Sequence, residues 1–182
     1  MEPILVMRAR RGDRDAFADI AAAIGDRLYA VAHRILRDRE LAGDATQETL
    51  VKIWQELPTL REVDRFDAWS HRLLINACRD ELRRQRRTPS TVHLLPHDDP
   101  VADASLTVAD RDQLERGFRR LTADQRAVVI LQYYLDYSLA EIATTLDLPI
   151  GTVRSRLHYA KRALRAALDA DRRAAMPRRS SA

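Results

Sequence analysis

The chain has 182 residues, of which 46% are hydrophobic, so it can form one domain or two small ones with buried cores. Only five glycines and three phenylalanines occur, and Ala, Leu, Arg and Glu are abundant, which predicts an all-α protein. The net charge is +4 and the pI is near 9.6, and the arginines are clustered, so we expect a polyanion as partner.

Three helices are predicted in the first half of the chain. Apolar residues recur at helical spacing from about 13 to 37, and again from about 41 until Pro58 stops the pattern. Residues 58–65 show no periodic spacing of apolar residues and are expected to form a loop. A third helix should start near Phe66 and end in the arginine-rich run 83–87. We expect these helices to pack into a first domain, residues 1–87.

A flexible acidic linker is expected at residues 88–110, which contain three prolines and four aspartates but no Lys or Arg. A second small helical domain, 111–170, should follow. It begins with a short helix and continues with a capping box at Thr122 and Gln125, a pattern that starts helices. Residues 171–182 are expected to be a disordered tail.

A helix-turn-helix is predicted within the second domain. Ser138 and Glu141 form another capping box, and Pro149 with Gly151 interrupts the apolar pattern before a longer helix begins. Val153, Leu157, Ala160 and Leu164 form the inward stripe of that longer helix.

The outer side of the longer helix is basic, and residues 151–165 contain no carboxylate. A helix-turn-helix places such a helix in the major groove of DNA, where its N-terminal residues reach bases and its flanks meet phosphates. The alternative is a solvated basic helix in an ordinary helical hairpin. We expect duplex DNA contacts from Thr152, Arg154, Ser155, Arg156, His158, Tyr159, Arg162 and Arg165.

The arginine run at 83–87 indicates a second nucleic-acid contact. It could be only a solvated helix end that Asp80 and Glu81 stabilise. However, Phe66, Trp69 and the amide of Asn76 lie in the same domain, and such groups can hold an unstacked base while arginines hold phosphates. Both tryptophans of the chain, Trp54 and Trp69, are nevertheless expected to be core residues.

The sequence gives no sign of catalytic chemistry or of a membrane segment. No Gly-rich phosphate loop and no Ser/His/Asp or Cys/His arrangement occurs, and His93 and His97 lack a third ligand, so we expect no enzyme, metal or cofactor. The single Cys78 excludes a disulfide within the chain. The apolar run 4–7 is too short for a signal peptide or membrane span, which favours a cytoplasmic protein without membrane insertion.

Three segments in this order carry a resemblance to a known family: DATQETLVKIW (44–54), FDAWSHRLLINACRDELRRQRR (66–87) and SLAEIATTLDLPIGTVRSRLHYAKRALR (138–165). They resemble bacterial RNA polymerase sigma factors of the extracytoplasmic-function (ECF) group. The resemblance implies that the first domain is sigma region 2, that the second is region 4, and that the linker replaces region 3. It implies a protein that brings core RNA polymerase to promoters and helps to melt them.

The resemblance also implies partners and sites. One implied partner is core RNA polymerase, which is contacted through its β′ clamp helices and its β flap. The others are promoter DNA, in double- and single-stranded form, and a separate anti-sigma factor. The implied polymerase contacts are Asp44, Gln47, Glu48 and Lys52. The loop 58–66 would help to hold a flipped base. The implied minus-ten contacts are Arg65, Asn76, Arg79, Arg83, Arg84, Arg86 and Arg87.

Two other functions fit parts of the pattern. An ordinary helix-turn-helix transcription activator would bind duplex DNA alone, but the basic helix at 66–87 and the 44–54 motif argue against it. A helical adaptor that binds only proteins would show no salt-sensitive DNA binding.

Overall fold

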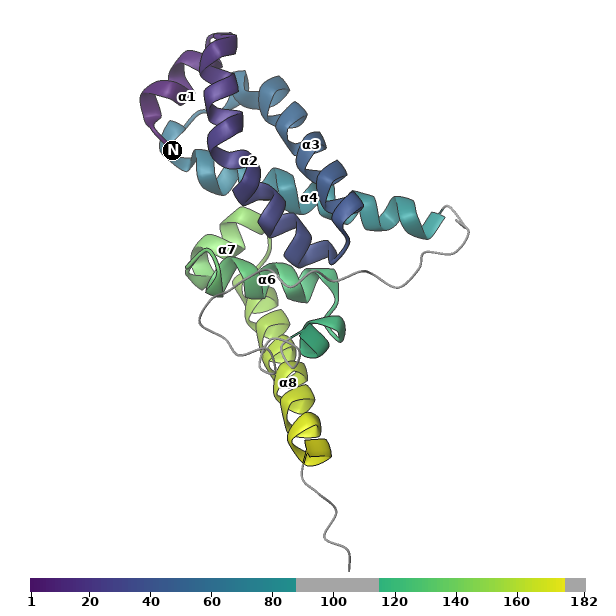
Figure 1. Cartoon of the computed structure of the whole chain (residues 1–182). Coiled ribbons are helices and arrows are strands. Elements are labelled where there is room, and N and C mark those ends of the chain that lie inside the picture. The colour runs from purple at the N-terminus through teal and green to yellow at the C-terminus, as the bar shows by residue number, and fades with distance from the viewer. Residues whose placement is uncertain (88–114, 176–182) are drawn as a thin grey trace, which may run out of the picture.

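The computed structural model describes residues 1–87 and 115–175, which are helical and contain no strand. The expected linker and the last residues, 176–182, lie outside the described part, as do His93 and His97. Figure 1 shows two groups of helices, one above the other, with α8 projecting from the lower group. The upper group consists of α1 (Pro3–Arg10), α2 (Arg14–Leu36), α3 (Arg39–Glu56) and α4 (Phe66–Arg87). The lower group consists of a helical segment at 115–119, α6 (Ala123–Tyr133), α7 (Leu139–Leu146) and α8 (Ile150–Ala175).

Aspartate caps set the starts of α2 and α3. Asp13 accepts a hydrogen bond from the Ala16 amide at 3.0 Å, and Asp38 accepts one from the Leu41 amide at 3.0 Å. Each bond satisfies one of the amide groups that a helix start leaves unpaired. Arg37 ends α2 in the left-handed conformation, with φ 62°. The predicted helices at 13–37 and 41–57 are therefore confirmed, and the second starts two residues earlier because Asp38 caps it.

The first domain contains one helix more than the three predicted. Pro3 opens α1 at a position where proline costs no hydrogen bond. Val6 and Ala9 are buried as α1 packs against α2. The predicted loop at 58–65 also has local order, because two short 3-10 turns, η1 (Leu57–Thr59) and η2 (Val63–Arg65), occupy most of it.

Both predicted capping boxes are present in the second domain. The Thr122 hydroxyl accepts from the Gln125 amide, while the Gln125 side chain accepts from the Thr122 amide. Ser138 and Glu141 repeat this arrangement at the start of α7. α7 ends at Leu146, and the next residue, Asp147, is left-handed with φ 51°, so the chain turns directly into α8. α8 continues to Ala175, five residues beyond the expected end of the domain.

The two groups of helices pack against each other. α2 contacts α6 and α4 contacts α7, so that the buried residues of both domains form one continuous cluster. Local sequence patterns do not predict this seam, because they describe each helix and not its distant neighbours. None of the described helices has both the length and the apolar composition that a membrane span requires.

Candidate nucleic-acid and polymerase interface

One face of α3 carries the four predicted polymerase contacts. Asp44 and Gln47 are exposed, and Glu48 and Lys52 are half-buried. Lys52 Nζ lies 2.8 Å from Glu48 Oε1. Val51 lies on the same side and leaves 54% of its surface exposed. An exposed aliphatic residue among polar and acidic groups suits a protein partner better than DNA.

Arg84 of α4 joins this acidic face. Its Nη2 lies 2.8 Å from Glu48 Oε2, and its Nη1 contacts Glu81. The hydrogen bonds from Lys52 and Arg84 lower the pKa of Glu48, although partial burial opposes them. Burial raises the pKa of Glu81. Arg84, which was predicted to contact DNA, is therefore already paired with two carboxylates.

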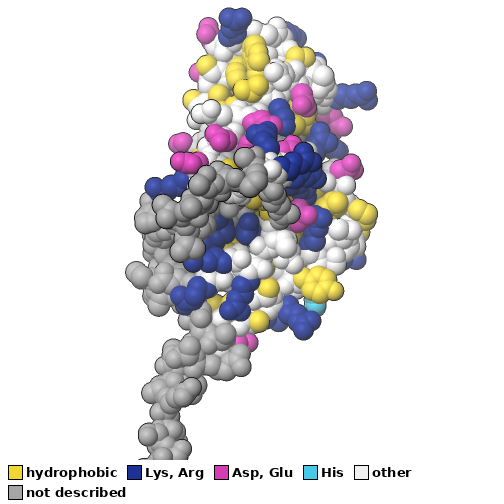
Figure 2. Space-filling view, turned by 90° about the vertical axis from the view of Figure 1, so that its right-hand side faces the viewer, with side chains coloured by type: hydrophobic (Ala, Val, Ile, Leu, Met, Phe, Trp, Pro, Cys, Tyr) yellow, Lys and Arg dark blue, Asp and Glu magenta, His cyan; other side chains and the backbone are white. Residues whose placement is uncertain are grey.

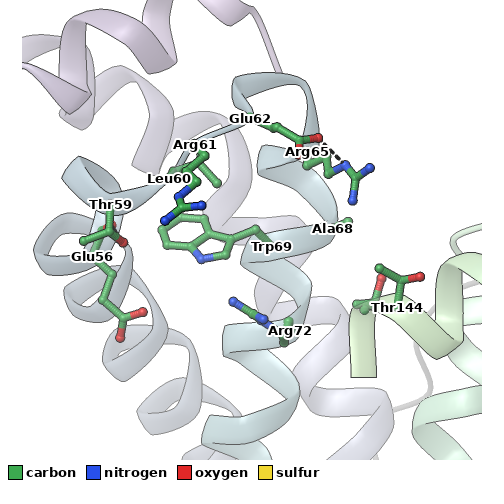
Figure 3. Close-up of a pocket in the computed structure, with 11 residues that line it drawn as sticks. Glu56, Thr59, Leu60, Arg61, Glu62, Arg65, Ala68, Trp69, Arg72 and Thr144 are labelled. Carbon is green, nitrogen blue, oxygen red and sulfur yellow. Dashed lines mark hydrogen bonds and ion pairs between the residues drawn. The ribbon is translucent and has the colours of Figure 1, made fainter. Parts of the chain in front are cut away.

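A cleft of about 430 Å³ opens beside the 3-10 turns, between α3 and α4 (Figure 3). Trp69 forms part of its wall, and Arg61, Arg65 and Arg72 supply cationic groups around it. Arg65 is held by an exposed ion pair with Glu62, 2.6 Å between Nε and Oε2. Two carboxylates, Glu56 and Glu62, also line this cleft. The indole and the guanidinium groups suit a base and its phosphates.

The two tryptophans have different surroundings. Trp54 packs against Phe17, with ring centroids 4.9 Å apart. Trp69 packs against the buried Phe66, with centroids 5.9 Å apart, and is half-buried against the core. The expectation that both are core residues is therefore correct only in part. Trp69 packs against the core but also lines the cleft, and Trp54 is half-buried beside Phe17.

A second cleft, of about 590 Å³, gathers three of the predicted minus-ten residues: Asn76, Arg79 and Arg83. Asn76 is exposed, and Arg79 Nη1 approaches its side-chain oxygen at 3.4 Å. Arg83 is exposed and pairs with Asp80 at 3.3 Å. Arg87 is exposed at the end of α4, and the side chain of Arg86 lies outside the described residues. Arg72 lines both clefts.

Sequence reasoning missed Arg72, and it included Arg61 only as part of the loop 58–66 without naming it. A usable signal was present, because Arg72 follows Trp69 by three residues on α4 and therefore lies on the same side of that helix. Arg61 lies in the loop that Pro58 opens, where no periodic pattern indicates the direction of a side chain.

α8 has the predicted division between a buried and an exposed side. Val153, Leu157 and Ala160 are buried. Figure 2 shows Lys and Arg side chains spread over both domains on the face that it presents. The exposed members of the predicted recognition set are Arg154, Ser155, His158, Tyr159, Arg162 and Arg165.

Two members of that set are less accessible. Thr152 is half-buried, and its carbonyl accepts a hydrogen bond from the Ser155 hydroxyl at 2.9 Å. Arg156 Nη2 lies 2.9 Å from Asp124 Oδ2 of α6, and the side chain is 25% exposed. Its Nη1 is buried without a hydrogen-bond partner. Arg156 is thus directed to α6 and not to the outer face of α8.

Known families match both domains. Residues 20–88 match the family description "Sigma-70 region 2", and residues 111–164 match "Sigma-70, region 4". The chain is 33% identical over 152 residues to the ECF RNA polymerase sigma factor SigM of Mycobacterium tuberculosis. The alignment covers 82% of this chain and 76% of SigM. The chain belongs to the ECF sigma factors. SigW of Bacillus subtilis is a further relative, 27% identical, with 88% of this chain and 92% of SigW covered.

Solved sigma-factor structures have the same fold. CnrH, solved in complex with the cytosolic domain of CnrY, superposes with a TM-score of 0.67 at 27% identity, covering 93% of this chain and 97% of CnrH. RpoE of Bartonella quintana, solved with the anti-sigma factor NepR, superposes with a TM-score of 0.68 at 24% identity. The match covers 85% of this chain and 98% of RpoE. The expected all-α, two-domain sigma architecture is confirmed.

This sigma factor therefore directs core RNA polymerase to promoter DNA, as the resemblance implied, and the reading as an ordinary activator is the weaker one. Sigma factors as a class are not enzymes. Among residues 1–87 and 115–175, no group of three metal-binding side chains is found.

Proposed function

We propose that three surfaces of this sigma factor divide the work of promoter recognition. The face of α3 around Asp44 binds the β′ clamp helices of core polymerase. The cleft beside Trp69 and the neighbouring cleft around Asn76 hold the unpaired minus-ten strand. The exposed side of α8 reads the upstream minus-35 duplex, and the second domain also meets the β flap.

The observation that carries this proposal is the cleft beside Trp69. Taking a base out of the duplex costs a few kcal/mol of stacking and pairing. Stacking on an aromatic side chain returns about 1–3 kcal/mol per base. Arg61, Arg65 and Arg72 line the same cleft, and their charges would neutralise the phosphates on either side of such a base. A plain duplex-binding activator has no use for a cleft of this kind.

Transcription from paired and pre-melted templates tests the cleft. We expect Arg61→Gln and Trp69→Ala to reduce transcription by the reconstituted holoenzyme on a fully paired promoter. A template with a permanent mismatch at the upstream bubble edge should restore part of the loss, since melting is no longer required. Arg14→Gln is the matched control, because Arg14 is an exposed arginine at the start of α2, outside both clefts. Equal transcription by Arg61→Gln and Arg14→Gln on the paired template would contradict the proposal.

We propose further that a separate anti-sigma factor binds this chain, and that the protein is a non-enzymatic one that acts in the cytoplasm with the polymerase. The support comes from CnrH and RpoE, whose solved complexes contain CnrY and the anti-sigma factor NepR. The boundaries 1–87, 88–110, 111–170 and 171–182 remain a prediction. Limited proteolysis followed by mass spectrometry would test them.

A further inference from the structure

A short arginine-rich stretch builds the corner between α1 and α2. Gly12 is left-handed, with φ 93°, and its amide donates to a carbonyl in the last turn of α1 at 2.9 Å. Arg8 reaches across the turn to Asp13, with 2.7 Å between Nη2 and Oδ2. Asp13 in turn caps α2 through the Ala16 amide. The last turn of α1 therefore has a fixed direction relative to α2, and Arg10 projects from that turn.

Arg10 joins this corner to the loop beside the cleft. Its Nη1 donates to the Leu60 carbonyl oxygen at 3.1 Å. Leu60 is 8% exposed, lies between η1 and η2, and lines the cleft beside Trp69. α1 also contacts both of these 3-10 turns. Within residues 1–87 and 115–175 the Arg10 side chain has no other hydrogen bond and no ion pair, so its polar contact goes to the loop and not to a carboxylate.

The contact fixes the peptide group that leads into Arg61. A peptide group is planar. Holding the Leu60 carbonyl therefore also sets the orientation of the Arg61 amide and the direction of the chain at that residue. Arg61 lies at a bend, and in the described part of the chain its side chain makes no hydrogen bond or ion pair. Figure 3 shows this side chain directed into the cleft, toward Trp69. Its direction thus depends on the backbone and not on a polar partner of its own.

The other hydrogen bonds of the loop are local. The amide of Leu60 donates back into η1, and the amide of Arg65 donates back to the Glu62 carbonyl, each at 3.1 Å. Both bonds close a single turn. Among the described residues, the Arg10 contact is the one hydrogen bond that joins residues 60–62 to an α-helix. It therefore ties the bend to the rest of the domain.

α1 lies outside residues 20–88, the range that matches Sigma-70 region 2. Arg10 is also absent from the minus-ten contacts that the sequence resemblance implied. Arg10 and Leu60 are 50 positions apart, so no local pattern indicates their contact. The support of the loop thus comes from a part of the chain to which neither the match nor the resemblance gives a role.

We propose that Arg10 is a positioning residue of the minus-ten cleft. It holds the peptide between Leu60 and Arg61 so that the Arg61 side chain lies in the cleft before DNA arrives, and α1 acts as the brace of the loop. This inference rests on the proposed role of the cleft beside Trp69. A loop that is already ordered loses less conformational freedom when DNA binds. Removing the Arg10 contact therefore weakens DNA binding although Arg10 itself touches no DNA.

A double-mutant cycle in the reconstituted holoenzyme tests this role. The variants are Arg10→Ala, Arg61→Gln and the two combined, and the probe is a labelled promoter whose minus-ten segment is unpaired. Arg11→Ala is the matched control, because it removes the same charge from the next position. Arg11 is exposed, and its side chain makes no hydrogen bond or ion pair within the described ranges. Arg10→Lys keeps the charge and an N–H donor, and the contact with Leu60 uses only one donor.

Arg10→Ala should lower the affinity of the holoenzyme for this probe about fivefold, since one hydrogen bond then no longer favours the competent loop. The double variant should bind as Arg61→Gln alone does, because Arg10 acts through Arg61. Arg10→Lys should recover most of the loss, and Arg11→Ala should match the wild type. If Arg10→Ala fails to assemble with core polymerase, Arg10→Gln takes its place in the cycle.

The proposal is overturned if the double variant is weaker than Arg61→Gln by the full Arg10→Ala factor. Arg10 would then act independently of Arg61, either on DNA or on the stability of the fold. It is also overturned if Arg10→Ala binds like Arg11→Ala, or if Arg10→Lys binds as weakly as Arg10→Ala. Failure of the proposed cleft looks different, because Arg61→Gln alone would then bind the unpaired promoter as tightly as the wild type.

Discussion

Arg84 of α4 donates a hydrogen bond to Glu48 of α3, with 2.8 Å between Nη2 and Oε2. The bond links the basic end of α4 to the face that we propose for polymerase binding. Glu48 also holds Lys52, so its two carboxylate oxygens each accept from a different cation. Arg84 is therefore placed to shape the polymerase face, whereas Arg83, one residue earlier, lines the cleft around Asn76.

We predict that Arg83→Gln and Arg84→Gln separate DNA binding from polymerase binding. Arg84→Gln should weaken core polymerase binding by about two- to fivefold, as expected for an exposed ion pair, and leave DNA affinity unchanged. Arg83→Gln should leave polymerase binding unchanged. It should lower the salt slope for single-stranded DNA by about 0.7, because one phosphate contact is lost. Titration of labelled sigma factor with core polymerase measures the polymerase affinity, and titration of holoenzyme on a pre-melted promoter at several salt concentrations measures the salt slope. If both variants lowered the salt slope for single-stranded DNA by the same amount, Arg84 would belong with the DNA contacts.

The recognition helix should contain residues that specify sequence and residues that only bind the backbone. Arg154 is exposed near the start of α8 and can reach a guanine edge, a contact worth about 1–3 kcal/mol. Arg154→Ala should relax preference at one or two base pairs of the minus-35 element. Arg165 lies three turns further along, so Arg165→Ala should weaken all sequences alike and lower the duplex salt slope by about 0.9. Holoenzyme binding to a panel of upstream elements at several salt concentrations distinguishes them. Identical behaviour of the two variants would contradict this division.

His71 should make stability depend on pH. Burial lowers the pKa of His71 to about 4, with a further lowering by the Arg27 charge and an opposing effect of Asp67. The folded protein therefore keeps this ring neutral while the unfolded chain protonates it near 6.5. The stabilisation is complete above pH 6.5 and is lost progressively as the pH falls from 6.5 to about 4. At pH 5 the loss should be about 2 kcal/mol relative to pH 7.5.

Urea unfolding of wild type and His71→Gln at the two pH values measures this effect. The variant should lose the His71 component of the pH dependence. His158→Gln is the control, because His158 is exposed on α8 and should leave the dependence intact. If the difference between pH 7.5 and pH 5 were the same in all three proteins, His71 would not be the group that titrates.

Most helices of this chain could be predicted because their signals are local. Thr122 with Gln125 and Ser138 with Glu141 each form a capping box from residues three apart, and the structure contains both. α1 was not predicted, since eight residues with only Val6 and Ala9 buried give almost no periodic signal.

The candidate site could be predicted only in part. The residue types on α3, α4 and α8 were visible in the sequence, but their partners were not. Asp124 and Arg79 are 45 positions apart, and Arg126 and Ile35 are 91 apart. A charged side chain that pairs across such a distance looks the same in the sequence as one that faces water. For this reason Arg84 and Arg156 were assigned to DNA, although the structure pairs each with a carboxylate.

Reconstituted transcription tests the central claim most directly. Core RNA polymerase is incubated with genomic DNA fragments, with or without this chain, and the 5′ ends of the transcripts are mapped. With the wild-type chain we predict discrete start sites that share a minus-ten and a minus-35 sequence. Asp44→Lys should abolish them at unchanged helicity, while Asp19→Lys, a charge reversal at an exposed position on α2, should not. Start sites that are the same with and without the chain would contradict the account.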